Sequence, residues 1–383
     1  MRFLLFISLF FVLSLSFAQI RKLELSAESG FQDNVFKSPT LIRQPDSFLH
    51  AIESDFFLGL SGEFDVRLQW GAPVRRNIQR HQVDLYHTLS THQFPQLLDA
   101  STIWGDVQGS YRYRFSQSLS FLAEGGYTHF HTPEDLKTPD RNIVSFGFRR
   151  WEAGTGVEVK GGRNHVSRIT VSYRNKDYLY QNSLDRKEYE GRYYARQRFR
   201  DAFGRVSYLR WNSNVHYRTY DNTRGTGVDE EGFEVLTGKR RFLQVQTDLS
   251  FEYPLRELLR IKPGIQFRYR EDIFPNRFDY YHLRPYLDLQ LEYGSLEMDV
   301  NASYTLRNYK DFNPGEGSSD HLQYQYLILR WEGVYSPKKN SKICPYWRVD
   351  WNSRSSSHEN LSRLTFRGYE SWAVRLGLRM KWE

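Results

Sequence analysis

The amino-acid sequence predicts an all-β protein, a transmembrane antiparallel up-and-down β-barrel of about 16 strands. Three observations lead to this fold class. Aromatic residues make up 16% of the 383 residues, and Tyr and Trp side chains favour membrane interfaces. Apolar and polar residues alternate along many segments, which gives each strand one apolar and one polar face. The mean hydropathy is −0.66, and beyond residue 18 the sequence contains no apolar run of the length of a membrane helix.

The N-terminus has the pattern of a secretory signal peptide over residues 1–18. Arg2 supplies the positive charge, residues 3–15 are almost entirely apolar, and Ser16 and Ala18 are the small residues before the cleavage site. The apolar run is short for a membrane anchor, so we expect cleavage and export. Export also argues against a nucleic-acid partner, although the net charge of +8 is basic.

After cleavage, residues 19–383 are expected to form a single barrel domain. The strand pattern begins close to residue 19 and continues to the last residues, so we expect neither a plug nor a periplasmic domain. Seven short turns divide this domain into eight hairpins, which places both termini on the periplasmic side. The predicted turns are residues 61–63, 116–118, 161–164, 212–214, 254–260, 294–295 and 337–342.

Longer polar stretches alternate with these turns, as expected for short periplasmic turns and long outer loops. The predicted outer loops are residues 30–47, 71–101, 132–141, 181–200, 223–239, 271–278, 311–320 and 352–363. Residues 81–87 could hide a further strand pair, and residues 198–211 fit more than one interpretation, so 14 and 18 strands are the alternatives. The basic residues between positions 186 and 200 are interpreted as a solvated loop, with contact to lipopolysaccharide phosphates as the alternative.

In the C-terminal half, charged side chains occupy one face of each predicted strand, and in a membrane barrel this face lines the lumen. The candidate lumen-lining residues are Asp248, Glu252, Arg268, Arg270, Asp288, Glu292, Asp299, Arg330, Arg348, Arg375 and Arg379. Charges of both signs facing water filter ions without holding one species. A soluble sandwich would alternate in the same way, so the membrane prediction depends on the aromatic content and the export signal together.

The last predicted strand alternates without interruption over residues 371–383. Arg375, Gly377, Met380 and Trp382 fall in order on the positions of the C-terminal assembly signal of bacterial outer-membrane β-barrels, which this stretch resembles. Glu383 departs from the pattern, because the signal ends on its aromatic residue. The resemblance implies insertion by the barrel-assembly machinery into the cell outer membrane, in contact with outer-membrane lipid and lipopolysaccharide.

The resemblance to porin-like barrels implies a passive channel for small hydrophilic solutes, since about 16 strands enclose a water-filled lumen. The alternative is a non-channel barrel that serves in surface adhesion, as an assembly partner or as a lipid-modifying enzyme. The sequence lacks the GxSxG and HExxH motifs. We therefore expect no enzyme and assign no catalytic residue, cofactor site or metal ligand. Assembly of barrels into a homo-oligomer is compatible with the sequence.

Overall fold

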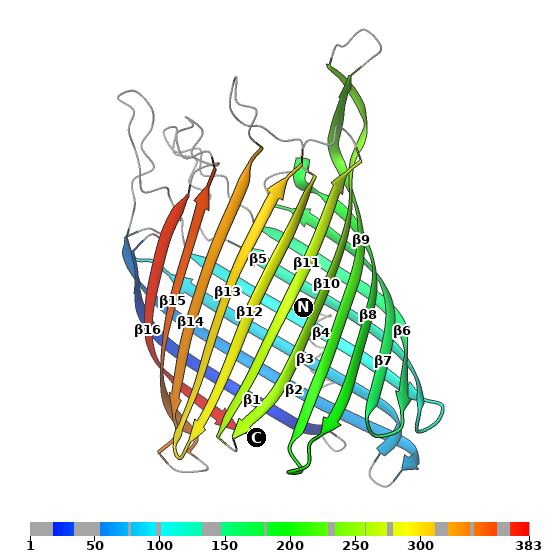
Figure 1. Ribbon diagram of the computed structural model, residues 1–383, viewed down its shortest axis with the longest axis vertical. Helices are drawn as coiled ribbons and strands as arrows, with labels where there is room; N and C mark the ends of the chain where they lie inside the picture. Colours follow the sequence, from blue (N-terminus) through cyan, green and yellow to red (C-terminus); the bar gives the residue numbers. More distant parts are fainter. Residues whose placement is uncertain are drawn as a thin grey trace, which may run out of the picture.

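The computed structural model is a closed barrel of 16 antiparallel strands (Figure 1). It describes residues 18–33, 54–75, 78–96, 101–131, 147–179, 182–228, 234–256, 258–273, 279–310, 321–337, 341–357 and 368–382. Each strand pairs with its neighbours along the chain, and β1 closes the barrel against β16. The predicted fold class and the strand number of 16 are confirmed.

The strands of the first half are β1 (Ala18–Gln32), β2 (Asp55–Arg75), β3 (Ile78–Gln93), β4 (Thr102–Arg114), β5 (Leu119–His131), β6 (Phe148–Gly161), β7 (His165–Tyr178) and β8 (Arg186–Arg200). The strands of the second half are β9 (Val206–Val228), β10 (Glu234–Arg256), β11 (Leu259–Asp272), β12 (Tyr280–Tyr293), β13 (Leu296–Tyr309), β14 (Gln323–Tyr335), β15 (Ile343–Ser356) and β16 (Tyr369–Trp382). A short 3-10 helix, η2 (Asn182–Leu184), lies between β7 and β8. Within the described residues, no helix has both the length and the apolar character needed to span a membrane.

The strands are long enough to cross a bilayer at a tilt, since even the shortest have 13 residues. Three strands are much longer, because β2 has 21 residues and β9 and β10 have 23 each. The two longest are β9 and β10. Figure 1 shows them continuing past the rim of the barrel as a two-stranded ribbon. The described residues therefore form one closed wall, and the β9–β10 ribbon projects from the end opposite the short turns.

The outer face of the barrel is apolar and the inner face is polar. Large apolar side chains are exposed on the outside, including Leu58, Leu60, Ile169, Val171, Trp211, Ile265, Phe267, Leu376 and Leu378. Polar side chains are buried inside, including Glu158, Glu188, Glu190 and Asp350. An exposed apolar surface of this extent needs an apolar solvent, and lipid provides it.

Two of the seven predicted short turns are wrong. Residues 61–63 lie inside β2, and residues 212–214 lie inside β9. Ser61, Glu63, Asn212 and Asn214 belong to the inner face, where Ser61 shares a 2.6 Å hydrogen bond with Ser26 and Glu63 pairs with Lys22. Ser213 lies on the outer face, where it accepts a 2.8 Å hydrogen bond from Trp211. Instead, β2 ends at Arg75 and β3 begins at Ile78, and the turn from β8 to β9 lies at residues 201–205. The other five predicted turns coincide with strand connections.

The predicted outer loops change with these turns. The loop predicted over residues 71–101 is wrong, because β3 lies inside it, and residues 81–87 belong to this one strand. The loop predicted over residues 181–200 is mostly β8, so its basic residues lie on a strand. The strand total is still 16, because each misplaced turn is replaced by one nearby. The predicted signal peptide, apart from Ala18, and Glu383 lie outside the described residues.

Candidate functional site

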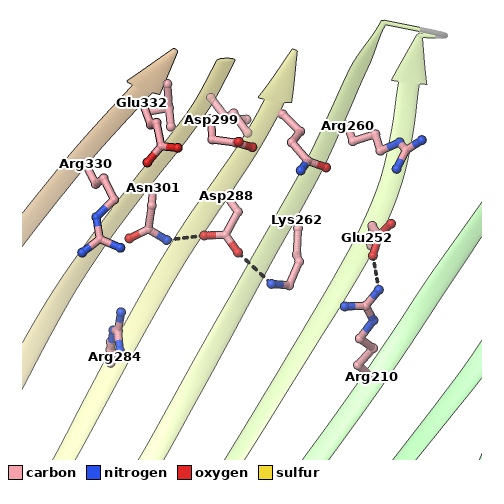
Figure 2. Close-up of a pocket in the computed structure, with 13 residues that line it drawn as sticks. Arg210, Glu252, Arg260, Lys262, Arg284, Asp288, Asp299, Asn301, Arg330 and Glu332 are labelled. Carbon is pink, nitrogen blue, oxygen red and sulfur yellow. Dashed lines mark hydrogen bonds and ion pairs between the residues drawn. The ribbon is translucent and has the colours of Figure 1, made fainter. Parts of the chain in front are cut away.

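The lumen-facing residues form rows that run across neighbouring strands. One row contains Lys262, Asp288, Asn301 and Arg330, because the register pairs each of them with the next on β11, β12, β13 and β14. The Lys262 ammonium lies 2.7 Å from Asp288, and the Asn301 amide donates a hydrogen bond to the other oxygen of the same carboxylate (Figure 2). The row is therefore a chain of polar contacts along the wall.

A cavity of about 690 Å³ lies against this row. Its lining includes Glu252, Asp288, Asp299 and Arg330, four of the residues predicted to line the lumen. Figure 2 shows Arg210 donating to Glu252 at one side of the cavity, apart from the Lys262–Asp288–Asn301 group. Charges of both signs thus face the same water-accessible space.

A second cavity, of about 250 Å³, is lined by three further predicted residues, Arg348, Arg375 and Arg379. Arg375 lies 3.2 Å from Glu28 of β1. Arg379 lies 2.8 Å from Glu332 of β14 and 3.1 Å from Glu24 of β1. These ion pairs tie the last strand to both sides of the barrel closure.

Asp350 of β15 lies at the centre of a cluster of three arginines. Its carboxylate lies 2.8 Å from Arg330, 2.8 Å from Arg348 and 3.5 Å from Arg375, and the residue is only 7% exposed. Asp350 was absent from the predicted site, although it occupies the charged face of its strand. The sequence alternation could have identified it as lumen-facing, but only the strand register shows that three arginines converge on it.

The remaining predicted residues are held outside the two cavities. Asp248 accepts a 3.0 Å hydrogen bond from the Tyr286 hydroxyl. Arg268 donates a 2.9 Å hydrogen bond to Gln246. These contacts place both residues on the lumen wall, as their position on the charged face predicts.

Arg270 and Glu292 lie near opposite ends of the barrel. The Arg270 guanidinium lies 4.6 Å from the ring centres of both Phe242 and Tyr280. Glu292 is exposed beside the β12–β13 turn and lines neither of the cavities described above. The structure therefore does not bring Glu292 together with the other predicted residues.

The wall formed by β6, β7, β8 and β9 carries ion-pair groups that the sequence analysis missed. Glu158 is 3% exposed and lies 3.3 Å from Arg112, 3.5 Å from Lys160 and 2.7 Å from Arg168. Such a carboxylate needs its cationic partners, because an unpaired buried charge is very unfavourable. This group therefore cross-links the wall.

The basic segment interpreted as a loop contributes to the same wall. On β8, Arg186 lies 2.8 Å from Glu188, and Arg192 lies 2.9 Å from Glu190. Glu190 also lies 2.6 Å from Arg174 of β7. The signal that could have found this arrangement is the alternation of Arg and Glu along residues 186–192, which is the period of a strand.

Among the residues that the structure describes, no three His, Cys, Asp or Glu side chains are grouped in a way that could hold a metal ion.

No protein-family model matches the sequence, and the comparison with curated proteins finds no match. Solved structures do match. OpdQ of Pseudomonas aeruginosa is 8% identical, with 95% of this chain and 97% of that chain covered and a TM-score of 0.48. OmpT of Vibrio cholerae is 7% identical, with 96% and 98% covered and a TM-score of 0.48. A bacterial polysaccharide outer membrane secretin is 10% identical, with 96% and 98% covered and a TM-score of 0.44.

Proposed function

We propose that this barrel is an outer-membrane channel for the passive diffusion of small hydrophilic solutes. The observation that carries the proposal is the cavity of about 690 Å³ inside the barrel, lined by acidic and basic side chains. A closed barrel with an apolar outer face and a charged inner face is the arrangement of a membrane channel. Sixteen strands also enclose more space than their inward side chains fill.

The ion pairs in the lumen support weak charge preference over most of the wall. Glu252 is paired with Arg210, and Asp288 with Lys262, so neither sign dominates the cavity. A solute crossing the lumen therefore meets alternating donors and acceptors rather than a single strong field.

Planar-bilayer recording of the refolded protein tests this function. Folded barrels should give stepwise increases in current that scale with the bulk salt concentration. The control is the same preparation after heat unfolding, which should give no steps. Heat-modifiable migration shows whether the barrel is folded. A folded barrel that inserts into the bilayer but does not conduct would contradict the channel function and favour a non-channel barrel.

We also propose that the short turns face the periplasm and that the β9–β10 connection faces outward. An epitope tag inserted within residues 229–233 should then bind antibody on intact cells. The matched tag at residues 76–77, in the β2–β3 connection, should bind antibody only after the outer membrane is permeabilised. The opposite pattern would invert the orientation.

A further inference from the structure

Three basic side chains form one row near the ends of β11, β12 and β13 that lie away from the short turns. The register pairs Arg268 directly with His282, and His282 directly with Arg307. Directly opposed residues of antiparallel strands have Cβ atoms about 4.5–5.5 Å apart. Arg284 lies two residues along β12 on the same face. We name Arg268, His282, Arg284 and Arg307 the basic patch.

The basic patch differs in its ion pairing from the groups around Glu158 and Asp350, in each of which one carboxylate serves three cations. Within the described part of the chain, no carboxylate lies at ion-pair distance from Arg268, Arg284 or Arg307. Three guanidinium groups therefore surround His282 without a carboxylate between them, and their mutual repulsion weakens the empty wall.

The positions around the basic patch do not supply the missing negative charge. The lumen-facing neighbours in register or two residues away include Gln246, Gln266, Arg270, Tyr280, Tyr286, Thr305, Tyr309 and Tyr324, and none of these is a carboxylate. The carboxylates on the flanking parts of these strands have other contacts, since Asp248 bonds to Tyr286 and Asp272 to Arg240.

The basic patch also contains polar atoms without hydrogen-bond partners. His282 is 6% exposed, and neither of its ring nitrogens has a partner. The buried Nε atoms of Arg284 and Arg307 also have no hydrogen-bond partner, and neither does the hydroxyl of Ser303 on the same face of β13. Leaving a buried polar atom unsatisfied is unfavourable, and native proteins rarely do so. Other buried arginine Nε atoms along the wall also lack partners, but in His282 both ring nitrogens of a buried side chain do, and they lie beside three guanidinium groups. A ligand oxygen would complete the hydrogen bonding at this place.

Aromatic rings hold the arginines without occupying all of their donors. The Arg307 guanidinium lies 4.9 Å from the ring centre of Tyr280 and 5.3 Å from that of Tyr326. Contact with a ring face stabilises a guanidinium while its N–H groups stay available at the edge. The donors are thus fixed before a ligand arrives, which reduces the entropy lost on binding.

Access to the basic patch is through the lumen. Arg284 lines the cavity of about 690 Å³, and Figure 2 shows it set apart from the hydrogen-bonded groups around Asp288 and Glu252. Arg268 and Arg307 are partly exposed. A solute in the cavity can therefore reach the basic patch by way of Arg284.

From these observations we propose that the basic patch binds the anionic group of a solute, a phosphate or a carboxylate. Guanidinium groups match the geometry of both anions, and the bound charge offsets the repulsion within the row. The inference rests on the proposed channel function only for the route by which the solute arrives. It deepens that function by naming organic anions as a substrate class.

Calorimetric titration of the detergent-folded barrel tests the site independently of conduction. Inorganic phosphate and succinate are the two probes, and at least one should give saturable heat. Arg268→Gln and Arg307→Gln should each weaken that binding by about tenfold or more, the usual effect of losing a charge-assisted hydrogen bond. The matched control is Arg67→Gln, because Arg67 also faces the lumen but is paired with Asp84 at 2.6 Å. Its affinity should equal that of the wild type.

The apparent unfolding temperature gives a second readout. Without the anion, Arg307→Gln should unfold at the wild-type temperature or above, because the repulsion is relieved. The anion that binds should raise the unfolding temperature of the wild type and of Arg67→Gln, but not that of Arg307→Gln. Arg307→Lys keeps the positive charge but loses the planar guanidinium that donates two parallel hydrogen bonds, so it should bind the anion with intermediate affinity. This variant replaces Arg307→Gln if Arg307→Gln does not fold.

The outcomes separate the site from the channel. If only phosphate gives saturable heat, the basic patch binds phosphorylated solutes. If only succinate does, it binds carboxylates. No heat with either probe on the folded wild type, or equal affinities in the wild type and both glutamine variants, overturns the site. A barrel that binds the anion without conducting keeps the site and loses the channel, and one that conducts without binding does the reverse.

Discussion

Asp350→Asn is expected to lower the free energy of unfolding by about 3 kcal/mol, in the range for removing one partner of a buried ion pair. The carboxylate is 7% exposed and holds the guanidinium groups of Arg330, Arg348 and Arg375 within 2.8–3.5 Å. Asn keeps the size of the side chain and removes its charge, so three cations lose their shared partner. Urea titration of the barrel folded into lipid vesicles measures the change.

The same substitution should shift the reversal potential in a salt gradient toward anion selectivity, because the local charge becomes more positive by one. The matched control is Asp65→Asn, whose partner Arg21 lies 3.3 Å away with a side chain that is 43% exposed. Its effect on stability should stay below about 1 kcal/mol, as for other exposed pairs. Equal unfolding of the Asp350 and Asp65 variants would show that solvent, rather than Asp350, balances the three arginines.

Gly377→Ala is expected to have the second large effect, a loss of about 3 kcal/mol or failure to close the barrel. A Cβ atom at Gly377 would lie 2.5 Å from the backbone oxygen of Ala27 and 2.6 Å from the Tyr346 ring. The ring could turn away, but the oxygen belongs to β1, which pairs with β16 to close the barrel. The folded fraction after refolding, read from heat-modifiable migration, measures the effect.

The control for Gly377→Ala is Gly191→Ala on β8, where a Cβ atom would meet nothing within 4 Å. Alanine loses less conformational entropy on folding than glycine, so this change should be neutral or stabilise by about 0.5 kcal/mol. Similar folded fractions for the two variants would contradict the steric argument. They would leave recognition by the assembly machinery as the reason for glycine in the C-terminal signal.

The fold class could be predicted because it depends on a local pattern. Alternation assigns each side chain to a face without reference to any other strand. The residues predicted to line the lumen, from Asp248 to Arg379, lie on β10–β16, and seven of them line the two cavities described above. The strand number also followed, because it depends on how many turns there are and not on their exact positions.

The two misplaced turns show where local patterns mislead. Ser, Gly and Asn are typical of turns in soluble proteins, but a polar lumen accepts them in mid-strand, as at Ser61 and Asn214. The true turn at residues 201–205 is formed by Asp201, whose carboxylate accepts the N–H groups of Phe203 and Arg205 at 2.9 and 2.8 Å. Gly204 has a φ of +79°, which glycine adopts without strain. Asp followed three residues later by Gly was the available signal.

The contacts within the site could not be predicted, because they depend on register. A shift of one residue moves every side chain of a strand to the other face. A shift of two residues keeps each side chain on its face but changes which residues are opposed. The convergence of three arginines on Asp350, and the row Arg268–His282–Arg307, exist only in the correct register. A sequence lists the charges of a lumen, whereas the register decides which of them neutralise one another.

The ribbon formed by the ends of β9 and β10 gives this closed sheet something that the barrel itself lacks, namely two free edges. Among the described residues, the backbone of β9 from residue 224 and that of β10 up to residue 239 are in register only with each other, over about 15 Å of strand. The barrel wall is hydrogen-bonded around its whole circumference and has no place for another strand. Above the rim, the outward backbone groups of the ribbon match an extended peptide, which could add itself as a third strand. Such attachment would depend on backbone shape, so a proline in the ribbon would disturb it more than a change of surface charge.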